Sequence, residues 1–303
     1  MTLVTAKRPF IPFVAMPRHT LASVPHAASL AVTHLSERIM KSSLLIAFLM
    51  FLARSVDADG ASGDRYLTPQ FSAGQTYSNV FSILRSVRAE GYDERASRNG
   101  GSADYTILSA NADSWGARAR SRYDGQASGD DSIEFRDNGS TYCMANAEGK
   151  TTCNAYLEGS GLAYNTAIWG VPPKPLAPGM SWTVDLKQAW ELGGSNGTEK
   201  VTVISMDPAT DTAVLLREGT SQGFFAESDP HTLQLSHDGH TEMLEVKPGT
   251  AHWKGYTTFV KGVVFSDELV VTRDDVLISK SGSTVNATER RVMLLNVAPF
   301  PTL

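Results

Sequence analysis

The sequence predicts an all-β protein built from antiparallel meanders. Short runs of alternating apolar and polar residues follow one another along the chain, separated by turns rich in Gly, Asn and Asp. No segment of helical length carries apolar residues at a sustained spacing of three or four positions. With 42% hydrophobic and 19% charged residues, the composition permits a sizeable core and argues against a disordered tail or a membrane bundle.

The sequence also contains an internal repeat, which predicts that two stretches of the chain fold alike. The stretch Ile133 to Tyr156 aligns without a gap on Leu233 to Tyr256, and several Gly, Thr and Tyr residues coincide. The dipeptides Asn138-Gly139 and Asp238-Gly239, which suit tight hairpins, coincide as well. We therefore expect both stretches to adopt the same three-stranded meander.

Weaker matches in the same order extend the repeat upstream, pairing residues 71–78 with 176–183 and residues 100–109 with 193–205. Residues 64–175 and 176–303 are therefore interpreted as two divergent copies of one β unit. The rival interpretation is two unrelated meanders that share turn chemistry.

The packing of the copies has two alternatives. Strands expected after Val263 have no counterpart in the first copy, so the duplication is incomplete or the first copy borrows its last strands. A pseudo-symmetric barrel or two packed sandwich-like lobes would both give the edge strands a partner.

The N-terminal region predicts export. The apolar run Leu44 to Ala53 is too short to span a bilayer but suits the centre of a signal peptide. Lys41 supplies a positive charge before it, and Val56-Asp57-Ala58 offers a cleavage site, so we expect a signal peptide at residues 40–58. Residues 1–39 are either an upstream segment from a mis-assigned start codon or an organelle presequence. The product is expected in the periplasm or outside the cell.

The charge of the chain bears on its partners. The full sequence carries a formal net charge of −5. Residues 1–58 hold six Lys or Arg and two acidic residues, so their removal takes away +4 and leaves −5 − 4 = −9. Phosphate backbones and anionic membrane surfaces repel such a chain, which disfavours nucleic acid as a partner. No membrane span is expected in the mature chain.

The proline-rich connector supplies a resemblance. Gly170 to Trp182, with the sequence GVPPKPLAPGMSW, contains a P-G-x-S-W motif. This segment resembles those of uncharacterised secreted bacterial β-rich domains. The resemblance covers about a dozen residues and implies an exported β-domain without implying an activity.

Several familiar catalytic signatures are absent from the mature sequence. It contains no Ser-x-x-Lys pair, His-Glu-x-x-His helix or Cys-x-x-Cys pair. Carboxylates from distant strands could still form a catalytic pair without leaving a local motif. We expect no cofactor and favour a non-catalytic protein.

One hairpin offers candidate metal ligands. A two-residue turn at Asp238-Gly239 would place His237 opposite His240, with Glu242 on the same face. Two imidazoles and a carboxylate could bind a divalent metal such as zinc. The alternative is a solvated hairpin tip with Glu242 paired to Lys254.

The two cysteines predict a disulfide. An exported protein meets an oxidising compartment, and Cys143 and Cys153 are the only cysteines in the chain. A three-residue loop at residues 147–149 would place them directly opposite each other on neighbouring strands. The alternative is two buried free thiols.

Three functional hypotheses follow. The first is a non-catalytic exported protein that binds a small apolar ligand or an envelope component. Tyr164, Trp169 and Trp182 near the connector would line its pocket, because aromatic rings beside a concave sheet suit small apolar molecules. The same rings could instead only fill an interface. The second hypothesis is an interaction or assembly protein of the envelope, and the third is a metal-assisted hydrolase that uses the histidine hairpin.

Overall fold

The computed structural model describes residues 63–111, 114–123, 126–127, 133–145, 149–155, 161–186, 197–223 and 231–299. The predicted signal peptide at 40–58 and the segment 1–39 lie outside these residues, so both stay predictions. Ser62–Leu303 form one compact unit.

The all-β prediction is confirmed. The long strands carry β-branched and aromatic residues in alternation with polar ones, the composition that suits a pleated surface buried on one side. The described strands are β1 (Thr76–Ala89), β2 (Arg95–Ala110), β3 (Trp115–Tyr123), β4 (Gln126–Ala127), β5 (Ile133–Arg136), β6 (Thr141–Ala145), β7 (Thr151–Ala155), β8 (Ser181–Leu186), β9 (Gly197–Asp207), β10 (Thr212–Gln222), β11 (Thr232–His237), β12 (His240–Lys247), β13 (Thr250–Val260), β14 (Val263–Ile278) and β15 (Thr284–Pro299). Three short helical turns accompany them, η1 (Gly63–Tyr66), η2 (Asp137–Gly139) and α2 (Thr166–Trp169).

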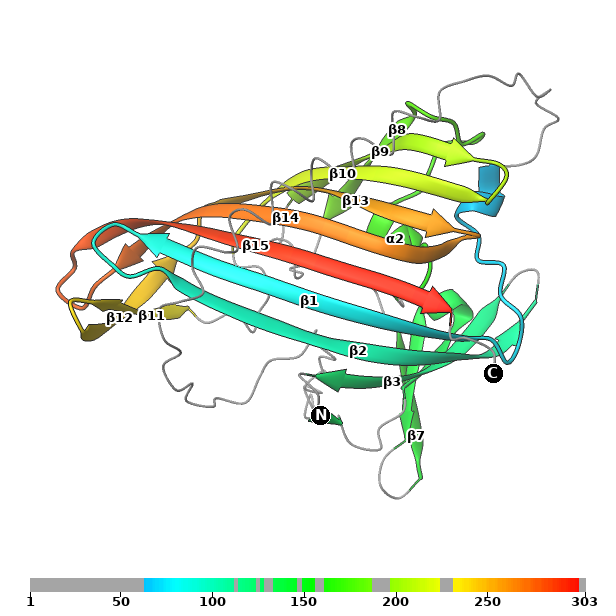
Figure 1. Cartoon of the computed structure of the whole chain (residues 1–303), viewed down its shortest axis with the longest axis horizontal. Helices are drawn as coiled ribbons and strands as arrows, with labels where there is room; N and C mark the ends of the chain where they lie inside the picture. The colour runs from blue at the N-terminus through cyan, green and yellow to red at the C-terminus, as the bar shows by residue number, and fades with distance from the viewer. Residues whose placement is uncertain are drawn as a thin grey trace, which may run out of the picture. The chain divides into compact units, whose positions relative to one another are not determined.

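The strands form one antiparallel sheet of 15 strands. Its main path runs β7-β6-β5-β3-β2-β1-β15-β14-β13-β10-β9-β8, with β4 paired to β3 and the β11–β12 hairpin attached through β12 to β14. Figure 1 shows β1 and β15, distant in sequence, side by side in the middle of the sheet, where Tyr77 is paired with Pro299. Because β7 and β8 are not paired with each other, the sheet is open.

This topology corrects the predicted packing. The described strands form neither a closed barrel nor two separate lobes, and they do not show a two-copy symmetry. One long sheet results because β1, from the first proposed copy, pairs along its whole length with β15 from the second. The edges of β1 and β15 therefore pair with each other in the middle of the sheet.

The prediction of two identical meanders is also wrong. β5, β6 and β7 pair in sequence order, as expected for the first stretch. In the second stretch β11 pairs with β12, but β12 then pairs with β14 and not with β13. The physical reason is that β10 and β14 already occupy both edges of β13, so β12 finds no free hydrogen-bonding groups there.

The predicted hairpin turn at Asp238-Gly239 is confirmed. His237 is paired with His240, which leaves Asp238 and Gly239 as a two-residue turn with φ values of 47° and 76°. Two successive positive φ angles are the signature of a type I′ turn. The matching turn in the first stretch is wider, because Arg136 is paired with Thr141 across four residues.

One face of the sheet carries the core. Along β14 the side chains of Leu269, Val271, Arg273, Asp275 and Leu277 are buried while those between them are exposed or half-buried. Apolar clusters lie at both ends of this face. One gathers beneath the β11–β12 hairpin, and the other gathers beneath the connector and includes Trp169, Leu176, Val201, Leu215 and Phe259.

Candidate functional site

The proline-rich connector and the residues before it, from position 161 onward, pack on the core face of the sheet. Ala163 forms an isolated antiparallel bridge with Val263, and the backbone N–H of Val264 donates to the carbonyl of Leu162 at 2.9 Å. Leu162 and Leu176 are buried on either side of α2. The connector therefore lies on the sheet as a second layer.

The three aromatic residues predicted near the connector are brought together. The Tyr164 hydroxyl donates to the carbonyls of Trp169 and Gly170, at 3.1 and 2.8 Å, and the indole N–H of Trp182 also donates to the Trp169 carbonyl. The Tyr164 and Trp169 rings contact Phe259, with centroids 5.8 and 5.2 Å away. Burial raises the pKa of Tyr164, so its hydroxyl remains a neutral donor.

These contacts place Trp169 in the apolar core, with Tyr164 and Trp182 packed against it. Tyr164 also lines a neighbouring cleft, whereas Trp169 and Trp182 are not part of the cleft's lining. A ligand-binding role for the trio stays a prediction, and packing accounts for most of their contacts.

The cleft lies where the connector meets the segment after η1 and the turn between β2 and β3. Its volume is about 370 Å³, within the range of small-molecule sites. Its apolar lining includes Leu67, Pro69, Phe71, Trp115, Pro172 and Leu176. The Phe71 and Trp115 rings meet edge to face at 5.1 Å, which gives the cleft an aromatic wall.

Polar groups occur at a few places along the cleft. Asn111, Ser114, Asn138 and Lys174 also line it. The Asn138 side chain accepts the backbone N–H of Trp115 at 2.9 Å, so this amide helps to fix the aromatic wall. A mostly apolar cleft with several polar groups suits the recognition of a small apolar molecule with a polar end.

The structure adds buried ion pairs that the sequence interpretation missed. Glu199 accepts hydrogen bonds from Arg217 Nε at 3.1 Å and from the Trp253 indole at 2.7 Å. Arg217 also contacts Asp267 at 3.3 Å, and the Thr257 hydroxyl donates to the same carboxylate at 2.6 Å. Burial alone would lower the pKa of Arg217, but the charges of Glu199 and Asp267 outweigh it and raise the pKa.

A second network lies on the same face. Glu289 accepts two bonds from Arg85, at 2.7 and 2.8 Å, one from Arg291 at 2.7 Å and one from Arg273 at 3.4 Å. Arg273 also forms a bidentate pair with Asp275, at 2.7 and 3.0 Å. Burial raises the pKa of Glu289, but the positive charges of Arg291 and Arg85 and the hydrogen bond from Arg85 prevail and lower it to about 2.

At the Asp275 carboxyl the effect of burial on the pKa is larger than the effect of the neighbouring positive charge. Its burial outweighs the attraction of Arg273 and raises its pKa. The alternation of the strand could have predicted that these two side chains are buried. Arg273 and Asp275 occupy every second position after Leu269 and Val271, and so point to the same face of the sheet. Ion pairs of this kind fix charged side chains within the core; as described, they do not form a nucleophile and its base.

The histidine hairpin is less well supported as a metal site. Among the residues that the structure describes, no group of three or more His, Cys, Asp or Glu side chains is arranged to hold a metal ion. His237 lies 3.2 Å from Asp238, both well exposed, and Glu242 accepts the Tyr92 hydroxyl at 2.8 Å. The suggested pair of Glu242 with Lys254 is wrong, because Lys254 pairs with Glu218 at 2.8 Å. The zinc site at His237, His240 and Glu242 stays a prediction.

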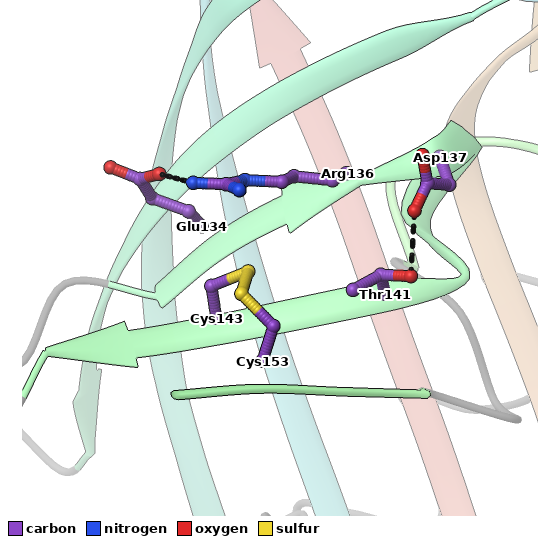
Figure 2. Close-up of a disulfide and its surroundings, with 6 residues drawn as sticks. All are labelled: Glu134, Arg136, Asp137, Thr141, Cys143 and Cys153. Carbon is purple, nitrogen blue, oxygen red and sulfur yellow. Dashed lines mark hydrogen bonds and ion pairs between the residues drawn. A yellow bond between two sulfur atoms is a disulfide. The ribbon is translucent and has the colours of Figure 1, made fainter. Parts of the chain in front are cut away.

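The predicted disulfide is present. Cys143 and Cys153 lie directly opposite each other on β6 and β7 and are bonded, with their Cα atoms 4.0 Å apart (Figure 2). The same close-up shows Thr141 bonded to Asp137 across the turn between β5 and β6, and Arg136 paired with Glu134 along β5.

Comparisons with known proteins do not assign the chain to a family. No family model and no curated protein matches it. A solved structure of lipovitellin is similar over 77% of this chain, which spans only 26% of that one, with a TM-score of 0.33 and 10% identity. A mutant of the Rh. blastica porin matches over 74% of this chain and 100% of its own, with a TM-score of 0.21 and 6% identity. For Neisserial surface protein A the coverages are 73% and 96%, with a TM-score of 0.17 and 7% identity.

TM-scores of this size do not establish a shared fold. A proposal for the function therefore has to rest on the geometry of this chain. In the described part of the chain, none of the helices combines the length and the apolar character needed to span a bilayer.

Proposed function

We propose that the protein is an exported, non-catalytic binding protein that holds a small apolar ligand in the cleft beside the connector. The observation that carries this proposal is the cleft of about 370 Å³ with its aromatic wall of Phe71 and Trp115. Apolar surface that a ligand covers there is removed from water, at about 25 cal/mol for each Å².

Several features support a preformed site. Trp115 and Leu176 are buried, and Trp115 is fixed through its backbone by Asn138. A wall held in place before binding reduces the entropy that the complex loses. The disulfide supports the exported location, because such bonds persist in oxidising compartments.

Val171 offers a direct test. Its side chain lines the cleft and is 73% exposed, so a carboxylate at this position should leave the fold intact. V80D is the matched control, because Val80 is 58% exposed on β1 and does not line the cleft.

The measurement is a fluorescence titration with the apolar probe N-phenyl-1-naphthylamine, followed by displacement with a fatty acid. We expect V171D to weaken probe binding by about tenfold, equivalent to about 1.4 kcal/mol, and V80D to leave it unchanged. Equal binding by V171D, V80D and the unaltered protein, or no binding by any of them, would contradict the proposal.

A further inference from the structure

The free edge of the sheet at β7 has unusual properties. β7 ends the strand order, and no described strand pairs with its outer side (Figure 1). All five of its side chains are exposed. Its sequence, TTCNA, contains no charge and no proline. Proteins usually protect an exposed edge with charges, prolines or bulges, because an open edge accepts another strand.

The opposite edge differs. β8 carries the charged residue Asp185, and Val184 on the same strand is buried in the core. Two β8 edges would bring like charges near each other, which is unfavourable between strands. Of the two ends of the main strand path, β7 is therefore the one that a second strand can approach at lower electrostatic cost.

The disulfide shows which backbone groups of β7 face outward. Closely spaced opposite residues, with Cα atoms nearer 4.5 than 5.5 Å apart, do not exchange backbone hydrogen bonds in an antiparallel pair. Cys143 and Cys153, at 4.0 Å, are such a pair. The N–H and C=O of Cys153 therefore point away from β6, and by alternation those of Thr151 and Ala155 do the same.

We infer that β7 is the contact surface for a second copy of this chain, joined antiparallel about a two-fold axis at Cys153. In this register Thr151 faces Ala155 of the second copy, and Cys153 faces its own counterpart. In this register the outward N–H and C=O groups of Thr151, Cys153 and Ala155 can all form hydrogen bonds with the second copy. Thr152 faces Asn154 of the second copy, so no charge opposes another.

The lack of charge on β7 favours a second copy as the occupant. The full sequence is acidic, with a net charge of −5, so two copies repel each other where their charged surfaces meet. An uncharged edge avoids that repulsion, and an isologous contact requires an edge complementary to itself. The disulfide holds β7 to β6 and so presents the edge already ordered.

Two charged variants test the register. T152K/N154K places introduced lysines opposite each other across the two-fold axis, whereas T152E/N154K places opposite charges there. Within one chain these positions face Met144 and Tyr142, so both variants meet the same uncharged neighbours on β6. A155P is a third variant, which removes one outward N–H and no bond to β6.

The measurement is the mass of the purified protein, disulfide intact, by size-exclusion chromatography with light scattering over a wide range of concentrations. We expect the mass of two chains at high concentration for the unaltered protein and T152E/N154K, and of one chain for T152K/N154K and A155P. Circular dichroism checks that each variant is folded. The inference is overturned by a single-chain mass of the unaltered protein at every concentration, by a foreign peptide co-purifying in place of the second copy, or by equal behaviour of the two charged variants.

Discussion

Replacing Glu289 by Gln tests the buried network most directly. The carboxylate of Glu289 is 2% exposed and accepts bonds from Arg85, Arg273 and Arg291. Its pKa falls from an ordinary 4.5 to about 2 in the folded chain. At 1.36 kcal/mol for each pKa unit, this difference of about 2.5 corresponds to about 3 kcal/mol of stability at neutral pH.

The sign of the pH dependence follows from the lowered pKa. Because the folded protein binds a proton at Glu289 less readily than the unfolded chain does, the stabilisation is complete above the unfolded pKa of 4.5. It is then lost as the pH falls from 4.5 through about 2. Asp275, whose pKa is raised, acts in the opposite sense. Burial is the largest cause of that rise, but the charge of Glu289 adds to it, so E289Q also weakens this opposing contribution.

Urea unfolding, followed by tryptophan fluorescence, measures the effect. We expect E289Q to lower the free energy of unfolding by about 3 kcal/mol at pH 7, and the difference from the unaltered protein to shrink steadily below about pH 4.5. The control is E245Q, because Glu245 is exposed on β12 and its loss should change stability by less than about 0.5 kcal/mol. The reasoning would be refuted if E289Q and E245Q lowered the free energy of unfolding equally. It would also be refuted if the difference in unfolding free energy between E289Q and the unaltered protein did not depend on pH.

Two further predictions concern export and the disulfide. Edman sequencing of the secreted product should start after Ala58, and an intact Met1 to Arg54 segment in that product would exclude the proposed cleavage. Replacing both Cys143 and Cys153 by Ser should lower the free energy of unfolding by about 3 kcal/mol, since the bond closes a loop with a sequence separation of 10. Titration of the denatured, unreduced protein that finds two free thiols, or an unchanged unfolding midpoint in the double variant, would count against this estimate.

The local features of the structure could be predicted from the sequence. Period-two alternation and turn dipeptides predicted the strands, and Asp238-Gly239 forms the expected two-residue turn because few residues other than Gly, Asn and Asp adopt its positive φ angles. The disulfide was predicted for the same kind of reason. Its loop is short enough for the turn length alone to place Cys143 opposite Cys153.

The long-range arrangement was decided by tertiary structure alone. Similar stretches at 133–156 and 233–256 pair differently, because a strand's partner depends on which edges are free when the sheet is complete. The burial of Arg273 and Glu289 likewise depends on strands that bring opposite charges to neighbouring positions, and each strand by itself shows only alternation. Sequence determined the strands, the turns and the covalent link, since these are local properties. The strand order, the ion-pair networks and the cleft required the whole chain, because each joins residues that only the completed sheet brings together.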